Sequence, residues 1–290
     1  EGGIETSQAL LARRWDHIFF TGGTGIGRIV AKAGAEHLSR VTLELGGKSP
    51  TIVTASADLD VAARRIALAK GINAGQTCVA PDYVLVEASV HDGLVSRLKS
   101  ALVDFYGEDP RQSPDYGRII NERHFERLLG LIDADKVVHG GQHDATERYL
   151  APTLMTDVTM DDAVMADEIF GPVLPILRVE SVDEAIATIA QRPQPLALYL
   201  FTRDSADEKA VIDRVSFGGG CINNAIMHLG DPKLPFGGIG TSGMGAYHGH
   251  HSFEVFSHQK AVMKTATFLD PSVKYPPYEG KLGLFRRLIG

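Results

Sequence analysis

Cys78 lies in a sequence context that could support nucleophilic chemistry. It follows Gly75-Gln76-Thr77, a turn that comes after a helical stretch. Such a turn can bring a thiol and its own backbone N–H group to a cleft, where a thiolate attacks and the N–H group holds a developing oxyanion. A lone cysteine is more commonly an inert buried residue, and we interpret Cys221, in the apolar stretch 219–222, in that way.

Glu44 is a candidate general base. It lies inside the apolar segment 41–45 and is followed at once by Gly46-Gly47-Lys48. Burial raises the pKa of a carboxyl towards the range that general-base catalysis needs. The alternative interpretation is an internal ion pair with Lys48.

The glycine cluster TGGTGIG (21–27) could bind a phosphate, because a turn between a strand and a helix aims backbone N–H groups at an anion. Its spacing does not fit G-x-G-x-x-G, and Arg28-Ile29 follow it where a P-loop requires Lys-Ser/Thr. The alternative is a tight structural turn.

An acid and an aromatic residue stand close together in EIFGP (168–172). The carboxylate of Glu168 could accept hydrogen bonds from a ribose hydroxyl pair while the ring of Phe170 packs on a planar group. Core packing explains Phe170 equally well.

Alternating strands and helices must position these residues. The run 17–21, the glycine turn, a helix over 27–35 and a strand over 41–45 predict parallel strands joined by a right-handed crossover. The remaining expected helices cover 59–69, 90–105, 125–132, 182–190 and 208–215, and the remaining strands cover 83–87, 136–139 and 196–201. We expect a loop over 230–245 and an extended run over 253–263.

Composition narrows the possible functions. The 290 residues carry a net charge of −7, which argues against an extended nucleic-acid surface. Two cysteines form no disulfide framework and suit a reducing compartment, which we take to be the cytoplasm. No apolar run approaches about 18 residues, so no integral membrane segment is expected. The histidines of YHGHHSF (247–253) lack converging ligands, and we predict no metal site.

Four segments occur together in the order and approximate spacing of the aldehyde dehydrogenase superfamily. They are LELGGKSP (43–50), GQTCVAPDY (75–83), EIFGPV (168–173) and PFGGIGTSGMGAYHG (235–249). The last segment, with RIINERHF (118–125) and PLALYLF (195–201), resembles the class 3 and fatty-aldehyde branch. The resemblance spans essentially the whole chain. It implies an α/β fold with part of a Rossmann-like cofactor domain (1–46), an α/β catalytic domain (47–247) and a C-terminal oligomerisation strand and tail (248–290).

The resemblance implies a role for each matching residue. Cys78 would attack the aldehyde, and Glu44 would activate the hydrolytic water. NAD or NADP would accept the hydride, and an aldehyde, medium- or long-chain or aromatic, would be the substrate. The matching cofactor-binding residues are Gly22, Thr24, Leu45, Glu168 and Phe170, and Asn223 matches an asparagine near the substrate. A homodimer built partly through 253–263 is expected.

The sequence departs from the family pattern at its start, which falls partway through the cofactor domain. No residue matches the family's ribose-binding lysine or its oxyanion-hole asparagine. We therefore expect a piece of a longer enzyme whose activity in this exact form is open. Two alternatives remain: a catalytically incompetent chain acting as an interaction or oligomerisation module, and a cofactor-independent thiol hydrolase using Cys78 and Glu44.

Overall fold

The computed structural model of the chain describes residues 2–268 and 270–289. The chain divides into two compact units, the first ending at Phe256 and the second starting at Ser257.

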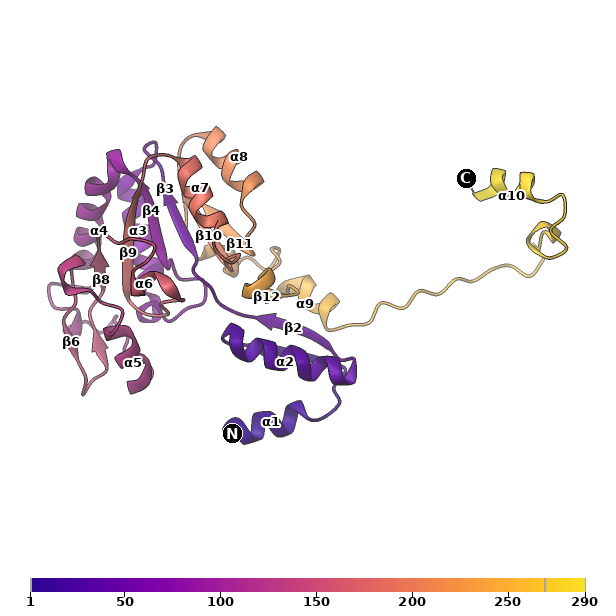
Figure 1. The fold of residues 1–290 in the computed structure, drawn as a ribbon, viewed down its shortest axis with the longest axis horizontal. Coiled ribbons are helices and arrows are strands. Elements are labelled where there is room, and N and C mark those ends of the chain that lie inside the picture. The colour runs from indigo at the N-terminus through magenta and orange to yellow at the C-terminus, as the bar shows by residue number, and fades with distance from the viewer. Residues whose placement is uncertain (1, 269, 290) are drawn as a thin grey trace. The chain divides into compact units, whose positions relative to one another are not determined.

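A seven-stranded sheet forms the centre of the first unit (Figure 1). Its strand order is β11-β10-β3-β4-β9-β8-β5, and every neighbouring pair is parallel except β5 with β8. The strands are β3 (Pro50–Val53), β4 (Tyr83–Glu87), β5 (Val137–His139), β8 (Thr153–Met155), β9 (Val173–Val179), β10 (Ala197–Phe201) and β11 (Gly219–Ile222). The four central strands, β10, β3, β4 and β9, are buried along almost their whole length, as expected for parallel strands covered on both faces.

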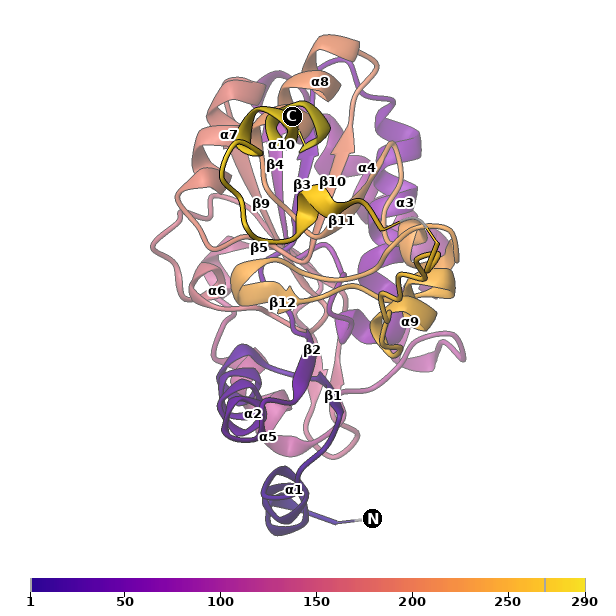
Figure 2. The ribbon, with the colours of Figure 1, turned by 90° about the vertical axis from the view of Figure 1, so that its right-hand side faces the viewer.

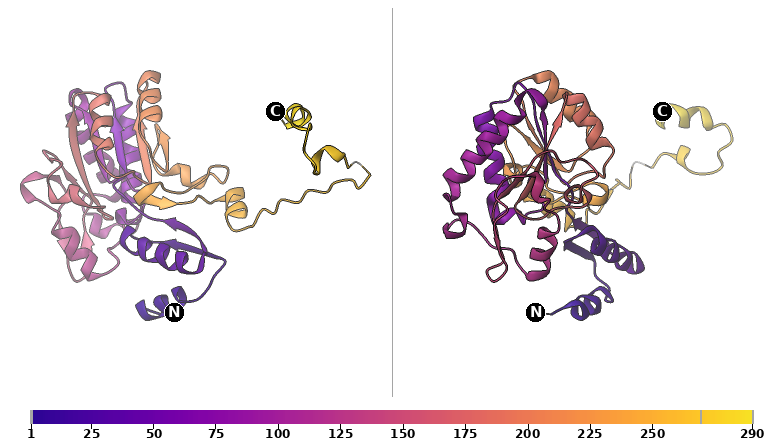
Figure 3. Two further views of the ribbon diagram at one scale, coloured as in Figure 1. Left: turned by 45° about the vertical axis from the view of Figure 1, so that its right-hand side comes forward. Right: turned by 60° about the vertical axis from the view of Figure 1, so that its left-hand side comes forward.

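Helices cover both faces of this sheet: α3 and α4 pack together on one face, and α7 and α8 on the other (Figures 2 and 3). Helix α3 begins where the Asp58 side chain accepts a hydrogen bond from Val61 N, and it turns Ala62, Ala63 and Ile66 into the core. The helices of this unit are α1 (Ile4–Leu11), α2 (Thr24–His37), α3 (Leu59–Gly71), α4 (His91–Tyr106), α5 (Glu122–Leu129), α6 (Ala163–Ala166), α7 (Val182–Ala190), α8 (Ser205–Arg214) and α9 (Gly249–Val255).

The start of the chain forms a separate, smaller sheet with its own apolar cluster. Strands β1 (His17–Thr21) and β2 (Arg40–Glu44) are parallel, and β12 (Gly243–Met244) pairs antiparallel with β2. Val30 of α2 packs with Leu43 and Leu45 in a small core. A two-residue pair, β6 (His143–Asp144) with β7 (Tyr149–Leu150), completes the strands of the described residues.

The predicted elements are confirmed as to type with two exceptions, although the helices expected over 125–132 and 208–215 each begin three residues earlier, at Glu122 and Ser205. The loop expected over 230–245 contains β12, because Met244 pairs with Leu43 at the edge of the small sheet. The expected extended run is wrong at its start, because 253–255 belong to α9. That helix begins where His248 N–H donates to Ser252 Oγ at 2.9 Å, a local contact that the alternating apolar residues do not reveal.

The described part of the second unit contains a 3-10 turn over Ser272–Lys274 and the short helix α10 (Leu282–Ile289). Its residues 257–268 form neither helix nor strand, and Val262 and Met263 are almost fully exposed. Through residues 2–268 and 270–289, no helix is both long enough and apolar enough to cross a membrane.

Candidate active site

A backbone kink between α3 and Cys78 sets the position of the thiol. Asn73 and Ala74 have φ of 54° and 51°, and Gly75 has φ of 73°. A methyl group at Gly75 would stand 2.2 Å from the carbonyl oxygen of Gly171, so only glycine allows this approach. The turn that carries Cys78 therefore lies directly against the EIFGP segment.

Gln76 holds this turn in place from within. Its amide nitrogen donates to Asn73 O at 2.9 Å and to Arg118 O at 3.0 Å, and its amide oxygen accepts from Ile120 N at 2.9 Å. The side chain is buried, so each of these bonds satisfies a polar group that water does not reach. The segment 118–125 is thereby tied to the cysteine turn, a role that the sequence did not reveal.

The Cys78 thiol is partly buried and, like that of Cys221, forms no disulfide within the described chain. Burial, followed by the nearby carboxyl groups of Glu168 and Glu44, raises the pKa of Cys78 to about 11. The backbone N–H groups of Cys78 and Val79 act in the opposite direction by hydrogen bonding to the sulfur. The thiol thus lies among two N–H donors and two carboxyl groups.

The Glu44 carboxyl group is buried at the end of β2, with 2% of the residue exposed. Neither of its oxygens has a hydrogen-bond partner among the described residues. Burial raises its pKa to about 8. A buried carboxyl without a partner is costly to charge, and such groups mark functional sites more often than structural ones.

Lys48 does not pair with Glu44, so the ion-pair alternative for Glu44 is wrong. The Lys48 ammonium binds the carboxylate of Asp82 and also donates to the carbonyl oxygens of Val164, at 2.9 Å, and Asp167, at 3.0 Å. The other oxygen of Asp82 accepts from Ile169 N at 2.9 Å. This buried pair joins three of the four segments that resemble the family pattern. A lysine and an aspartate in otherwise apolar segments were the signal that could have predicted it.

Glu168 points at the double glycine that follows Glu44. A methyl group at Gly46 would stand 2.1 Å from Glu168 Oε2, and the backbone N–H of Gly47 hydrogen-bonds to the carboxylate. Burial, followed by the charge of Asp82, raises the pKa of Glu168 to about 7. The carboxyl group therefore changes charge near neutral pH.

Phe170 is held with its ring partly exposed. Its φ is 48°, and 36% of the residue is exposed, so core packing does not account for it. Arg127 fixes the backbone before the ring by donating to Glu168 O at 3.3 Å and to Ile169 O. A non-glycine residue held at positive φ by its surroundings often belongs to a functional site.

The glycine turn leads into α2 next to Glu44. Gly22 N donates to Glu44 O at 3.0 Å, and the Thr24 hydroxyl donates to Thr241 O at 2.9 Å. Gly23 precedes the helix without a side-chain cap, and a methyl group there would meet nothing within 4 Å. The first turn of α2 therefore presents N–H groups that no capping side chain occupies.

The side chains of Leu45 and Asn223 both contact other parts of the protein. The Leu45 side chain is buried against Gly27, and its N–H donates to Ser242 O at 3.1 Å. The Asn223 amide accepts from Thr202 N at 2.9 Å and donates to Thr202 O at 2.8 Å. The structure thus places Leu45 under the glycine turn and uses the Asn223 side chain to hold the end of β10.

The histidines near the start of α9 are engaged with aromatic rings and an acid. His248 stacks on Phe236 with ring centroids 4.9 Å apart, and His250 and His251 lie 3.5 and 3.6 Å from Glu254. In the part of the chain that the structure covers, no three His, Cys, Asp or Glu side chains form a group that could hold a metal ion.

The fold and this site define an α/β protein with a half-buried thiol beside two carboxyl groups of raised pKa. Comparison with known proteins agrees with that class. The sequence profile of the aldehyde dehydrogenase family matches residues 1–262, and the chain belongs to that family.

Several relatives are about half identical to this chain. It shares 53% identity over 97% of its length with the 4,4'-diaponeurosporen-aldehyde dehydrogenase of Staphylococcus aureus, covering 62% of that protein. It shares 52% identity with the rat dimeric NADP-preferring aldehyde dehydrogenase, over 97% of this chain and 63% of that one. A solved structure of the substrate-bound state of Staphylococcus aureus AldH superimposes with a TM-score of 0.97 and 51% identity, covering 100% of this chain and 64% of the other.

The chain thus spans less than two thirds of the length of these relatives. The expected fold and family are confirmed, including the likeness to the class 3 branch, since a mouse aldehyde dehydrogenase family 3 member A2 is 52% identical over 95% of this chain and 57% of that protein.

Proposed function

We propose that this chain carries the thiol chemistry of an enzyme that oxidises an aldehyde to a carboxylic acid with NAD or NADP. The single observation that carries this proposal is the grouping of Cys78 with two backbone N–H donors, the unpartnered buried carboxyl of Glu44, and Glu168. Nucleophile, oxyanion donors and base are the parts that acyl chemistry at a thiol requires.

The first step is attack of Cys78 on the aldehyde carbonyl. The carbon–sulfur bond forms while the carbonyl π electrons move to oxygen, and the N–H groups of Cys78 and Val79 hold the resulting negative charge. Because the pKa of the thiol is high, its proton must leave during attack, and the ionised Glu44 carboxylate near the thiol accepts this proton and releases it to solvent before hydrolysis begins.

Oxidation converts the thiohemiacetal on Cys78 to a thioester, with loss of the hydrogen on carbon as hydride. The bound nicotinamide would supply the acceptor for that hydride. The chain's own part in this step is to exclude water and to hold the reacting carbon at the sulfur.

Hydrolysis then releases the acid. Glu44 takes a proton from water, the water oxygen attacks the thioester carbonyl, and the carbon–sulfur bond breaks. The proton then returns to the sulfur of Cys78, so that thiol and carboxylate are both restored.

The residues present fit a dinucleotide. The uncapped first turn of α2 next to Gly22 and Thr24 suits a pyrophosphate, the Glu168 carboxylate suits a ribose hydroxyl pair, and the partly exposed Phe170 ring suits a planar ring. Leu45 contributes by supporting the glycine turn from below. Asn223 would shape the substrate end of the site through the turn that it holds.

The substrate proposed is an aliphatic or aromatic aldehyde of medium or long chain. The name of the Staphylococcus aureus relative, which specifies 4,4'-diaponeurosporen-aldehyde, supports an aldehyde substrate. The name of the rat relative, which includes the word dimeric, supports a homodimer. In this proposal residues 248–290 contribute the contact, 1–46 belong to the cofactor domain and 47–247 to the catalytic domain. Two thiols that form no disulfide in the described chain support a reducing compartment such as the cytoplasm.

The two alternatives are less well supported. An interaction module has no use for an unpartnered buried acid beside a thiol. A thiol hydrolase has no use for a glycine turn and a Glu168 carboxylate directed at Gly46-Gly47. The experiment that separates all three follows reduced cofactor by absorbance on mixing the protein with an aliphatic aldehyde and NAD or NADP. We expect reduction that Cys78→Ala abolishes. If the parent protein hydrolyses an ester but does not reduce the cofactor, the hydrolase is supported. If it does neither, the interaction module is supported.

A further inference from the structure

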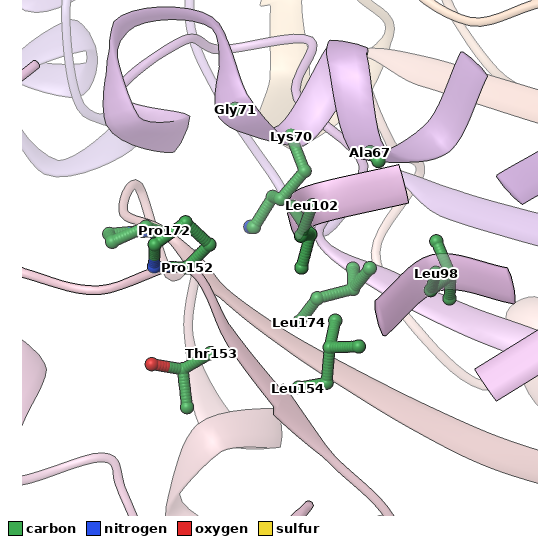
Figure 4. Close-up of a pocket in the computed structure, with 10 residues that line it drawn as sticks. All are labelled: Ala67, Lys70, Gly71, Leu98, Leu102, Pro152, Thr153, Leu154, Pro172 and Leu174. Carbon is green, nitrogen blue, oxygen red and sulfur yellow. The ribbon is translucent and has the colours of Figure 1, made fainter. Parts of the chain in front are cut away.

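A lysine that the proposed chemistry does not use is buried near the active site. Lys70 lies in the last turn of α3, and only 5% of it is exposed. Its ammonium nitrogen has no hydrogen-bond partner among the described residues. The side chain lines a cavity of about 10 Å³ and reaches across it towards Pro152 and Pro172 (Figure 4).

This cavity does not bind the substrate or the cofactor. A volume of about 10 Å³ is enough for a single water molecule and for nothing larger. Apart from Lys70 and Thr153, its walls are glycine and the apolar side chains of alanine, leucine and proline. Lys70 therefore acts on its surroundings through its charge rather than through a ligand held in the cavity.

The charge of Lys70 is coupled to the acids beside the active site. Burial lowers the pKa of Lys70 to about 8, while the charges of Asp82 and Glu168 act to raise it and Lys48 acts to lower it further. At neutral pH the side chain is thus still a cation. In return, its charge lowers the pKa of Glu168, as does that of Lys48.

The position of Lys70 in the chain explains how a cavity away from the thiol can influence the site. Lys70 comes just before the kink that leads to Cys78, and Pro172 ends the segment that begins with Glu168. Gly75 and Gly171 are in contact between these two segments. A charge at Lys70 is therefore held at a fixed place relative to Glu168.

We propose that Lys70 is a positioning residue that increases the ionised fraction of the Glu168 carboxyl group at neutral pH, so that the carboxylate can accept hydrogen bonds from the ribose of the cofactor. The inference rests on the proposed cofactor role of Glu168. It assigns a function to a buried cation that neither packing nor the thiol chemistry explains.

The groups that face Glu168 oppose one another. Burial and the charge of Asp82 favour the neutral form of Glu168. The Cys78 thiol is also close enough to interact electrostatically with Glu168. The Gly47 N–H, Lys70 and Lys48 favour the carboxylate. Lys48 is already neutralised by its pair with Asp82, whereas no acid among the described residues pairs with Lys70. Removing Lys70 should therefore shift Glu168 towards the neutral acid.

The melting temperature of a Lys70 variant distinguishes the proposed electrostatic role of Lys70 from a role in stabilising the fold. An unpartnered ammonium in an apolar cavity destabilises the fold, so Lys70→Met should leave the melting temperature unchanged or raise it. Because the pKa of Lys70 is lowered from 10.5 to about 8 in the folded protein, the unfolded chain binds more protons between those values. The increase in the free energy of unfolding that Lys70→Met produces is therefore full below about pH 8, and it disappears as the pH rises to about 10.5.

The test titrates Glu168 directly in the protein without cofactor. The infrared band of the protonated carboxyl is followed against pH and assigned by its loss in Glu168→Gln. In Lys70→Met we expect its midpoint to rise by about one pH unit, the effect of removing one nearby opposite charge. Lys70→Arg should restore the original midpoint, and Lys70→Gln repeats the test if the methionine variant does not fold. Lys209→Met, at an exposed lysine paired with Asp213, is the matched control and should change nothing.

Cofactor binding, measured by calorimetry at pH 7 and pH 9, separates the role of Lys70 from the proposed cofactor role of Glu168. A shift of about one unit from a pKa of about 7 reduces the ionised fraction at pH 7 roughly fivefold, with an equal loss of affinity that vanishes at pH 9. An unchanged infrared midpoint in both the methionine and glutamine variants would overturn the role of Lys70. A shifted midpoint with unchanged cofactor affinity would support it and overturn the proposed role of Glu168 instead.

Discussion

The Glu168 carboxylate lies so close to Gly46 that the two residues are sterically coupled: a methyl group on Gly46 would stand 2.1 Å from Glu168 Oε2. Gly46 is the second residue after Glu44, and the space that its missing side chain leaves is filled by the proposed cofactor acid. The backbone of the double glycine thus fixes where the carboxylate can point.

Gly46→Ala should therefore displace Glu168 and weaken cofactor binding. Loss of a hydrogen bond to a charged group corresponds to an increase of about tenfold or more in the KM for NAD or NADP, with a smaller effect on the KM for aldehyde. Gly230→Ala is the control, because a methyl group there meets nothing within 4 Å. Equal cofactor KM values for Gly46→Ala and the parent would contradict the proposed role of Glu168.

The two thiols should react differently with an alkylating aldehyde analogue. Cys78 lies beside Glu44 and Glu168, whereas Cys221 lies 3.6 Å from His228 Nδ1, and burial lowers the pKa of that histidine to about 4, so it carries no charge to activate the thiol. We expect inactivation to follow modification of Cys78, mapped by peptide mass spectrometry, and Cys221→Ala to be inactivated at the parent rate. Loss of activity with Cys78 still unmodified would show that the nucleophile has been assigned wrongly.

The turnover rate should rise with pH up to about 8. Glu44 takes protons from the thiol and from water only when ionised, and its pKa is raised to about 8, so the active fraction grows as the pH increases towards that value. In Glu44→Gln this limb of the pH–rate profile should be absent, and the steady-state rate should fall by about 10²–10⁴-fold. A variant that keeps both the rate and the limb would exclude Glu44 as the base.

The homodimer should depend on the exposed apolar residues of the second unit. Val262 and Met263 are 79% and 89% exposed, whereas Phe256 packs against His17 and Phe19. Val262→Lys with Met263→Lys therefore probes association without disturbing the described packing of the first unit. We expect a dimeric mass for the parent by light scattering and a monomeric mass for the double variant. A monomeric parent at micromolar concentration would refute the interface.

Much of the fold could be predicted because its signals are local. The buried strand 83–87 and the helix 182–190 have the bounds expected from their apolar patterns. The site was harder to predict, since Glu44, Cys78 and Glu168 meet only through pairing of distant segments. The Lys48–Asp82 pair, the Gln76 bonds and the unpartnered ammonium of Lys70 depend on long-range packing that no periodicity encodes. At the start of helix α9, His248 N–H donates to Ser252 Oγ, a contact that the apolar pattern does not indicate.

Trapping the acyl group on the protein tests the central claim most directly. Glu44→Gln is mixed with an aldehyde and NAD or NADP, quenched in acid, and examined by intact and peptide mass spectrometry. In this variant the thiol proton leaves to solvent, so attack and oxidation are slowed but still occur, whereas hydrolysis lacks its base. We therefore predict one acyl group per chain, located on Cys78, together with a single turnover of reduced cofactor. Reduced cofactor without a bound acyl group, or an acyl group on another residue, would contradict the account.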